Sequence, residues 1–432
     1  MKIRPKMLEG ISLFATIFCF MIVNVGLAAE TINVIAWPTA STHGLKILLP
    51  EFTKATGIKV NLELAPEPVL HEKVALSYAR STGDYDVAMI GMAQYPEFAA
   101  AGYVENLDPY VKNKLDPRWL DMDDFFPGFL DSLRVDGKLY ALPFYVWGGC
   151  LMYRKDLFEK YNVKVPKTIT EFAEAAKKLT VDTDGDGKID VYGLAERGTK
   201  GPFSTLSMAW IYSFGGEFLD EHYRPAFTSP EALKAVKLYV DLLKKYGAPG
   251  QANYNWMETV ELFTNGKAAM MIEASDFAGR VNDPSASKVA GKVGYAVMPQ
   301  EKRPSGYIFC AGWALASASK HKDAAWQFMQ WSTSNDVGVK TIDTARTDAP
   351  NRSVWQNEEY HERHPYSVIL TKCLNEAHPF YFPQIPEYTE IVMNYTSHVS
   401  EAIAGHVSVE EALNESSKEI SEILKDRIAK HK

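Results

Sequence analysis

The chain has 432 residues, of which 46% are hydrophobic and 23% are charged, and its formal net charge is −8. This balance is typical of globular proteins, and it excludes a disordered chain, a collagen-like fibre and a small disulfide-stabilised scaffold. The length suffices for two or three domains, each with its own hydrophobic core. The acidic charge argues against a broad nucleic-acid-binding surface, so we expect no nucleic-acid partner.

The first 29 residues predict a secretory signal peptide. The positively charged Lys2, Arg4 and Lys6 precede an apolar run over 11–29, which ends in small residues. A charged start, an apolar stretch and a small-residue cleavage site are the signature of such a segment. The alternative is an uncleaved membrane anchor, because the run is just long enough to span a bilayer. We expect cleavage at or near Ala29 and a periplasmic protein.

Outside this segment the chain has three cysteines, Cys150, Cys310 and Cys373. An oxidising compartment permits one disulfide among them and leaves at least one thiol. We favour the alternative that all three are small, buried, apolar residues. The stability of the mature chain is then expected to come from its cores.

The first third of the mature chain alternates between strands and helices. Strands are predicted at 31–37, 58–64 and 85–90, and helices over 45–56 and 69–80, with Gly57 ending the first helix. Strands that alternate with helices of this length are typical of βαβ units and a mostly parallel sheet.

The remaining two thirds contain fewer strands and more helices. Further strands are predicted at 139–146, 150–153, 268–272, 293–297 and 313–317, and helices over 170–179 and 230–246. From Asp323 onward the pattern predicts almost only helices, including a capping box at Ser408 and Glu411. Because no flexible linker separates the two regions, we predict an α/β protein of two lobes, with direct crossovers and a ligand cleft between them.

The common catalytic motifs are absent from the sequence. There is no G-x-S-x-G, no H-E-x-x-H and no phosphate-binding loop, and the ten histidines include no pair with zinc-site spacing. Cys150 follows Gly148-Gly149, which could expose its thiol, but a buried cysteine is the expected outcome. Composition alone singles out no carboxylate pair for glycoside hydrolysis. These motifs therefore single out no catalytic site, and no enzyme is expected.

One segment has the spacing of a calcium-binding loop. Its candidate ligands come at alternate positions: Asp182, Asp184, Asp186, Lys188 (through its carbonyl) and Asp190. This matches the first half of an EF-hand loop, but position twelve is Gly193, where a bidentate Glu belongs. Glu196 could substitute only in a wider loop. The alternative is a solvated acidic turn, and no other cofactor is expected.

Five aromatic residues are candidates for a ligand site. Trp37 ends the first predicted strand, and Trp210 lies in a mid-chain helix. The predicted crossovers contain Tyr145, Trp147 and Trp313. Ligands of open α/β sheets lie beyond the carboxyl ends of strands. There an aromatic face covers the C–H face of a sugar, while Asp, Gln and Arg hydrogen-bond its hydroxyls. Core packing is the alternative for each residue alone, but the set indicates a carbohydrate site.

Eight short segments, in this order and spacing, carry a resemblance to a known family. They are 51–60 (EFTKATGIKV), 83–87 (GDYDV), 98–103 (FAAAGY), 136–143 (DGKLYALP), 153–158 (YRKDLF), 215–216 (GG), 263–270 (FTNGKAAM) and 312–316 (GWALA). The chain resembles the extracellular solute-binding proteins of ABC transporters, carbohydrate type, related to maltose-binding protein. Residues 70–74 (LHEKV), together with 83–87, are most similar to the branch that serves sugars and sugar alcohols.

The resemblance implies a periplasmic-binding-protein fold. Its lobes would comprise residues 30–145 with 292–320, and 146–291 with 321–432, each a mostly parallel sheet flanked by helices. The crossovers would lie near 144–149, 290–294 and 319–323. A ligand that contacts both lobes would close them like a hinge, and the closed form would dock on a membrane permease. We expect a monomer.

Carried over position by position, the resemblance assigns eight side chains to the ligand. They are Trp37, Gln94, Tyr145, Trp147, Trp210, Asp276, Trp313 and Arg346. Asp276 and Phe277 stand where the family often has a Trp, so a long oligosaccharide is not expected, and the expected ligand is a small carbohydrate or polyol. One alternative is a polyamine, for which Asp86 and Asp276 would supply carboxylates, or another non-sugar solute. The other alternative is a secreted glycan-cleaving enzyme.

Overall fold

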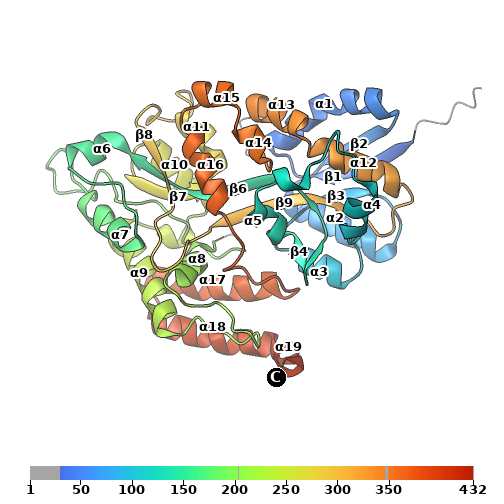
Figure 1. Ribbon diagram of the computed structural model, residues 1–432. Coiled ribbons are helices and arrows are strands. Elements are labelled where there is room, and N and C mark those ends of the chain that lie inside the picture. Colours follow the sequence, from blue (N-terminus) through green and yellow to red (C-terminus); the bar gives the residue numbers. More distant parts are fainter. Residues whose placement is uncertain (1–29, 203, 346–348, 432) are drawn as a thin grey trace, which may run out of the picture.

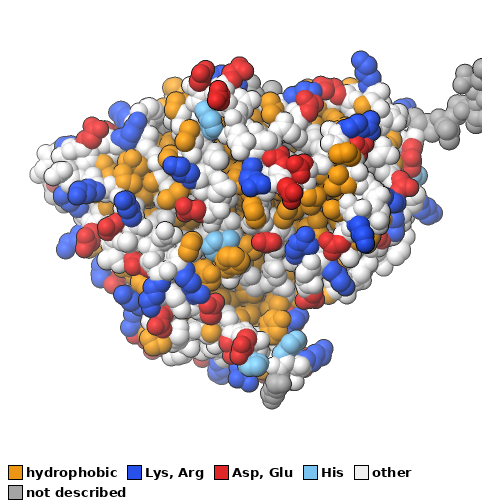
Figure 2. Space-filling view, viewed as in Figure 1, with side chains coloured by type: hydrophobic (Ala, Val, Ile, Leu, Met, Phe, Trp, Pro, Cys, Tyr) orange, Lys and Arg blue, Asp and Glu red, His pale blue; other side chains and the backbone are white. Residues whose placement is uncertain are grey.

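The computed structural model describes residues 30–202, 204–345 and 349–431, so the predicted signal peptide at 1–29 and Arg346 lie outside the described residues. No helix within these ranges is long and apolar enough to cross a bilayer. The molecule consists of two lobes side by side, and two long strands, β6 and β9, run between them (Figure 1). Acidic and basic side chains are interspersed on the face shown in Figure 2.

Seven of the described strands form one sheet in the order β2-β1-β3-β9-β6-β7, with β8 also paired to β6. They are β1 (Thr31–Ala36), β2 (Lys59–Leu64), β3 (Val87–Gly91), β6 (Leu142–Arg154), β7 (Met270–Ala274), β8 (Val293–Val297) and β9 (Ile308–Leu315). A separate hairpin consists of β4 (Arg134–Val135) and β5 (Lys138–Leu139).

The strand directions match the prediction only in part. β1 is parallel to β2 and β3, as expected for βαβ units. β9 is antiparallel to both β3 and β6, and β6 is antiparallel to β7 and β8. The two-lobed α/β class is confirmed, but the sheet is mixed. The reason is that β9 brings the chain back from the second lobe against β6, and such a return places neighbouring strands antiparallel.

β6 is one strand of 13 residues where the sequence suggested two separate segments. Its first half, Leu142–Gly148, pairs with β9, and its second half, Gly149–Arg154, pairs with β7 and β8. The glycine pair does not break the strand. A Cβ at Gly148 would lie 2.8 Å from a backbone oxygen of Cys373, and one at Gly149 would lie 2.3 Å from the Met298 sulfur. Only glycine permits this close packing where the chain passes between the lobes.

The first lobe includes helices from the first third of the chain and two helices from residues 322–345. They are α1 (Ala40–Thr56), α2 (Glu67–Arg80), α3 (Tyr95–Ala100), α4 (Asp108–Lys114), the short η1 (Met122–Asp124), α5 (Pro127–Ser132), α12 (Lys322–Ser332) and α13 (Asn335–Ala345). α12 and α13 pack on α1, where Phe52 contacts Phe328 and Trp331. This differs from the predicted boundary, which gave 321–432 to the second lobe. Helical periodicity shows which face is buried but not which lobe buries it.

The second lobe contains the middle of the chain and its last helices. They are α6 (Lys155–Lys160), α7 (Ile169–Lys178), α8 (Leu206–Ser213), α9 (Pro230–Tyr246), η2 (Gln251–Asn253), α10 (Trp256–Thr264), η3 (Ser275–Phe277), α11 (Ala278–Asn282), α17 (Tyr388–Ala404), α18 (Val409–Ile423) and α19 (Lys425–Lys430). Between the lobes lie α14 (Arg352–Trp355), α15 (Glu358–Arg363) and α16 (Ser367–Glu376), the last against β6 and β8. α17 packs on α9, and the predicted capping box of α18 is present.

Burial confirms the favoured interpretation of the cysteines. Cys150, Cys310 and Cys373 are buried thiols, and none of them forms a disulfide. The thiols of Cys150 and Cys373 both donate to the backbone oxygen of Ala296, at 3.4 and 3.7 Å. The stability of the described chain therefore comes from packing and hydrogen bonds.

Candidate functional site

A cavity of about 290 Å³ lies between the two lobes. The first lobe contributes Trp37, Thr39 and Glu67, which follow the carboxyl ends of β1 and β2. The strands that run between the lobes contribute Tyr145, Trp147 and Phe309. The second lobe contributes Arg197, Trp256, Ala274, Asp276 and Phe277. A molecule bound here would contact both lobes and both connecting strands.

Three aromatic rings form one wall of this cavity. The Phe309 ring stacks on Trp147, at 5.4 Å between centroids and 17° between planes, and on Trp37, at 5.9 Å and 30°. The ring of Tyr307 meets Trp147 edge-on at 5.2 Å. A Cβ at Gly91 would lie 3.2 Å from the Trp37 ring, so glycine at this position of β3 lets the indole pack down onto the sheet. The wall is a fixed apolar surface suited to the C–H groups of a ligand.

A second aromatic pair stands at the rim. The rings of Trp256 and Phe277 stack at 5.6 Å and 20°, and Trp256 remains 40% exposed. Trp256 is the first residue of α10, which Asn255 caps together with Glu258. The helix start thus holds an indole beside the cavity opening.

Asp276 supplies a carboxylate oxygen with no protein partner. Its Oδ2 accepts a hydrogen bond of 2.5 Å from the Tyr145 hydroxyl, whereas Oδ1 is buried and has no hydrogen bond. Burial is the main cause that raises the pKa of Asp276 to about 6, while the Tyr145 hydroxyl opposes it. A buried acceptor left unpaired is costly, so Oδ1 marks a place where a ligand donor would bind.

Arg197 is fixed beside the same wall. Its Nε and Nη2 donate to the two oxygens of Glu273, at 2.6 and 2.5 Å, and Glu273 is fully buried. The guanidinium also lies 5.9 Å from the centroid of the Trp147 ring. Such a two-pronged ion pair holds a planar donor group in one orientation next to the cavity.

Glu67 lies at the first position of α2, where the helix dipole favours a negative charge. Burial is the larger effect and raises the pKa of Glu67, whereas the neighbouring Gln94 amide lowers it. Glu67 lines both the main cavity and a smaller pocket behind Trp37. Gln94 lines only the smaller pocket, so its place is behind the cavity wall.

The structure brings four of the eight predicted ligand residues together and separates three. Trp37, Tyr145, Trp147 and Asp276 all line the main cavity, and their contact with a ligand stays a prediction. Besides Gln94, which lies behind the wall, two tryptophans are core residues and do not line it.

Trp210, on α8, is 1% exposed and packs edge-on against Phe172 and Tyr239 in the second lobe. Trp313, on β9, is fully buried between Phe144 and Phe328. The prediction that these two rings lie beside the ligand does not fit this packing. The eighth residue, Arg346, lies outside the described residues.

Sequence reasoning missed Thr39, Glu67, Arg197, Trp256 and Phe309. The chain around Arg197 forms isolated bridges parallel to β7, at Ala195 with Met271, and Arg197 follows them. Glu67 begins the helix after β2. The rule that ligands lie beyond the carboxyl ends of strands, applied to every predicted strand instead of to tryptophans alone, would have selected Glu67. No strand is predicted directly before Arg197, so the rule does not reach it.

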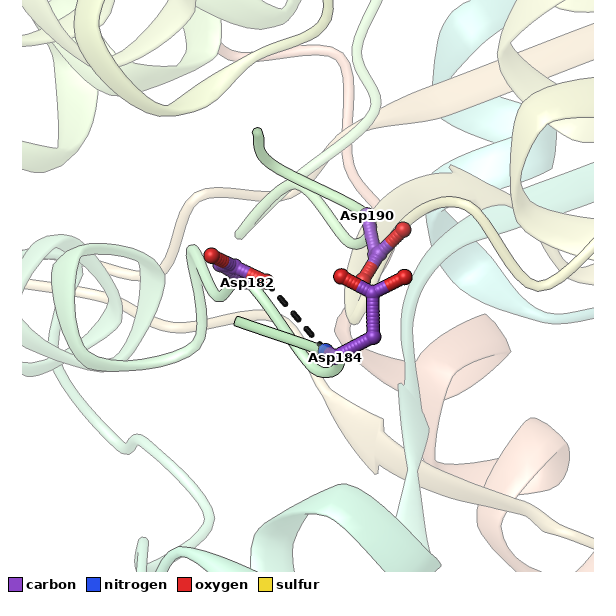
Figure 3. A group of neighbouring side chains, drawn as sticks. All are labelled: Asp182, Asp184 and Asp190. Atoms are coloured by element: carbon purple, nitrogen blue, oxygen red, sulfur yellow. Dashed lines mark hydrogen bonds between the residues drawn. The ribbon is translucent and has the colours of Figure 1, made fainter. Parts of the chain in front are cut away.

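The acidic loop of the second lobe holds its carboxylates close together. Oxygen atoms of Asp182, Asp184 and Asp190 lie within 4.8 Å of one another, and Figure 3 shows Asp184 and Asp190 pointing toward each other. Backbone N–H groups of Gly187 and Gly185 donate to Asp182 and lower its pKa. Its carboxylate therefore stays ionised, as a hard cation requires.

The two residues that could have completed an EF-hand are not available. A side chain at Gly193 would lie 2.0 Å from the backbone oxygen of Ala176. Glu196 is buried and accepts the N–H of Ile272 at 2.6 Å, so it does not turn toward the loop. Calcium binding by Asp182, Asp184, Asp186, Lys188 and Asp190 stays a prediction.

We expect Ca²⁺ to raise the melting temperature of the protein, because an ion that binds only the folded loop stabilises it by mass action. Asp182→Asn should abolish the Ca²⁺ effect without changing ligand affinity, since no loop residue lines the cavity. Thermal melts with Ca²⁺, with Mg²⁺ and with a chelator test this. Equal melting temperatures in all three would mean that the loop is a solvated turn.

Comparison with known proteins identifies the family. Residues 37–339 match the model of the bacterial extracellular solute-binding protein family. The chain is 32% identical, over 368 residues, to a mannitol-binding protein of Pseudomonas aeruginosa, covering 80% of this chain and 82% of that protein.

Two solved structures have the same fold. One is an ABC transporter solute-binding protein of Agrobacterium vitis with bound D-mannitol, with a TM-score of 0.77, 32% identity, and coverage of 92% of this chain and 99% of that one. The other is from Agrobacterium radiobacter in complex with ribitol, with a TM-score of 0.79, 30% identity, and coverage of 91% and 98%. Together with the two lobes and the cavity between them, these matches show that the chain belongs to the bacterial extracellular solute-binding proteins.

Proposed function

We propose that this protein captures an acyclic sugar alcohol of five or six carbons, of the mannitol and ribitol type, in the cavity between its lobes. The observation that carries the proposal is the composition of this cavity. An aromatic wall formed by Trp37, Phe309 and Trp147 faces the buried, unpaired Oδ1 of Asp276 and the fixed guanidinium of Arg197. The relatives that bind mannitol and ribitol support the same ligand class.

The size of the cavity favours one small molecule. A volume of about 290 Å³ is at the lower limit of small-molecule sites. The hydroxyls of a polyol would donate to Asp276 and Glu67 and accept from Arg197, while its C–H groups pack on the rings. Contacts to both lobes would favour the closed arrangement, because a ligand shifts a conformational equilibrium only through its different affinity for the two states.

The alternative of a polyamine ligand has less support. A polyamine site would use the carboxylates of Asp86 and Asp276, but Asp86 is 1% exposed. Its oxygens accept the N–H of Asn33, at 2.9 Å, and the hydroxyl of Ser319, at 2.6 Å. Asp86 therefore belongs to the packing of the first lobe, and of the two carboxylates only Asp276 lines the cavity.

We further propose that the protein binds without turnover. It would act as a periplasmic monomer after removal of residues 1–29 and would pass its ligand to the membrane permease of an ABC importer. Membership of the extracellular solute-binding family supports this course. If the site were that of a glycan-cleaving enzyme, substitution of Asp276 would abolish turnover, whereas in a binding protein it would weaken affinity.

A thermal-shift screen of the mature chain against sugars, sugar alcohols and polyamines, followed by calorimetry, tests the proposal. We expect D-mannitol or ribitol to raise the melting temperature with no product formed. The stabilisation should reach about 2.7 kcal/mol at one hundred times the dissociation constant. A shift with polyamines alone, or with no polyol, would refute the polyol assignment.

A further inference from the structure

The described lining of the cavity contains more acidic than basic groups. Among the described residues that line it, Glu67, Asp276 and Arg197 carry the ionisable acid and base groups other than tyrosine. Glu67 belongs to the first lobe and Asp276 to the second, so a ligand between the lobes meets a carboxylate on each side. Neither carboxylate forms an ion pair with a described residue. Asp276 accepts a hydrogen bond from the Tyr145 hydroxyl, and Glu67 lies beside the Gln94 amide in the smaller pocket.

The positive charge of Arg197 is already matched. Both oxygens of the fully buried Glu273 hold its guanidinium. The neighbouring Glu196 is also buried, accepts the N–H of Ile272 and does not line the cavity, so it does not face the ligand. Among the described residues that line the cavity, a surplus of two carboxylates, Glu67 and Asp276, therefore faces the ligand.

We propose that the cavity selects among polyols by charge. It accepts a neutral sugar alcohol, binds at least as well one in which an ammonium group replaces a terminal hydroxyl, and rejects the aldonate that carries a carboxylate at that carbon. This inference rests on the proposed function of the cavity as a polyol site. It extends the ligand class to cationic amino sugar alcohols.

The hydrogen-bonding groups account for this order. An ionised carboxylate only accepts hydrogen bonds, whereas an ammonium group only donates them. The three N–H groups of the ammonium can donate to the unpaired Oδ1 of Asp276 and to the carboxylate of Glu67. An aldonate would place acceptors against acceptors and a third negative charge between two. The ring faces of Trp37 and Trp256 add attraction for a cation and none for an anion.

Three ligands that differ only at one terminal carbon test the proposal: D-mannonate, D-mannitol and 1-amino-1-deoxy-D-mannitol. Calorimetry with the mature chain at neutral pH should show the amine binding at least as tightly as mannitol. Mannonate should bind about 100-fold more weakly or not at all, as expected when like charges face each other in a site. Asp276→Asn and Glu67→Gln should each lower the ratio of amine affinity to mannonate affinity. Glu72→Gln, an exposed change on the same helix as Glu67, should leave it unchanged.

The outcomes separate this inference from the proposed function. If mannitol binds but mannonate binds as well as the amine, or if both cavity variants keep the wild-type ratio, charge selection is refuted and the polyol site stands. If the amine binds and mannitol does not, the sugar-alcohol assignment falls while the charge selection stands. Absence of binding by all three overturns both.

Discussion

Replacing Arg197 by methionine is expected to lower the free energy of unfolding by about 3–5 kcal/mol, because it leaves a buried carboxylate without its counter-charge. Glu273 is fully buried, and its ion pair with Arg197 uses both oxygens. Glu196, the next acid along the chain, is already bonded to the N–H of Ile272 and offers no compensation. Urea unfolding at neutral pH measures the loss as a lower midpoint.

A second substitution shows whether the unpaired buried charge causes the loss of stability in Arg197→Met. In the double variant Arg197→Met/Glu273→Gln the charge is removed, and the amide oxygen can still accept the N–H of Ala274 that Glu273 now accepts. The double variant should therefore recover most of the lost stability. Lys245→Met is the matched surface control, because Lys245 pairs with Asp241 in an exposed position. If Arg197→Met costs no more than this control, the ion pair does not stabilise the fold.

The order of elements could be predicted because local signals determine it. Gly57 ends α1 in the left-handed conformation, with φ of 78°, and Ser229 with Pro230 begins α9. In both places the residues at the helix end favour the local backbone conformation without help from distant parts of the chain. The partners of a strand or helix depend on distant residues instead. For this reason the packing of α12 and α13 on α1 and the continuity of β6 through Gly148-Gly149 were not foreseen.

The candidate site was predictable to the extent that strand ends determine it. Trp37 lies just beyond the end of β1, and Trp147 lies within β6 at the predicted crossover, whereas Trp313 lies within β9 and is buried in the core. The side of the sheet that a ring faces depends on register, which one sequence does not show. Arg197 was missed because its selection depends on a buried carboxylate 76 positions away in the chain.

Protonation of Asp276 should weaken ligand binding. Burial, more than the nearby charge of Glu273, raises the pKa of Asp276 from its ordinary 3.8 to about 6, whereas Tyr145 and Arg197 favour ionisation. Folding therefore stabilises the protonated form of Asp276 more than the ionised form, although at neutral pH, above this pKa, the carboxylate is the main form. The raised pKa of Asp276 contributes to the stability of the folded protein below pH 3.8, and this contribution is lost as the pH rises through about 6. A hydroxyl that donates to Oδ1 needs the carboxylate, so affinity should fall by about tenfold per unit as the pH falls below this pKa.

Two variants isolate this carboxylate. Asp276→Asn should weaken polyol binding by about 10- to 100-fold at neutral pH, the range for loss of a hydrogen bond to a charged group, and should flatten the pH profile. Any slope that remains would belong to Glu67, whose pKa burial also raises. Tyr145→Phe removes the hydroxyl that lowers the pKa of Asp276, so the fall in affinity should begin at a higher pH. Calorimetric titrations from acid to neutral pH test both variants. If the wild-type affinity does not change through pH 6, or if the Tyr145→Phe profile moves toward acid, Asp276 does not bind the ligand as a carboxylate.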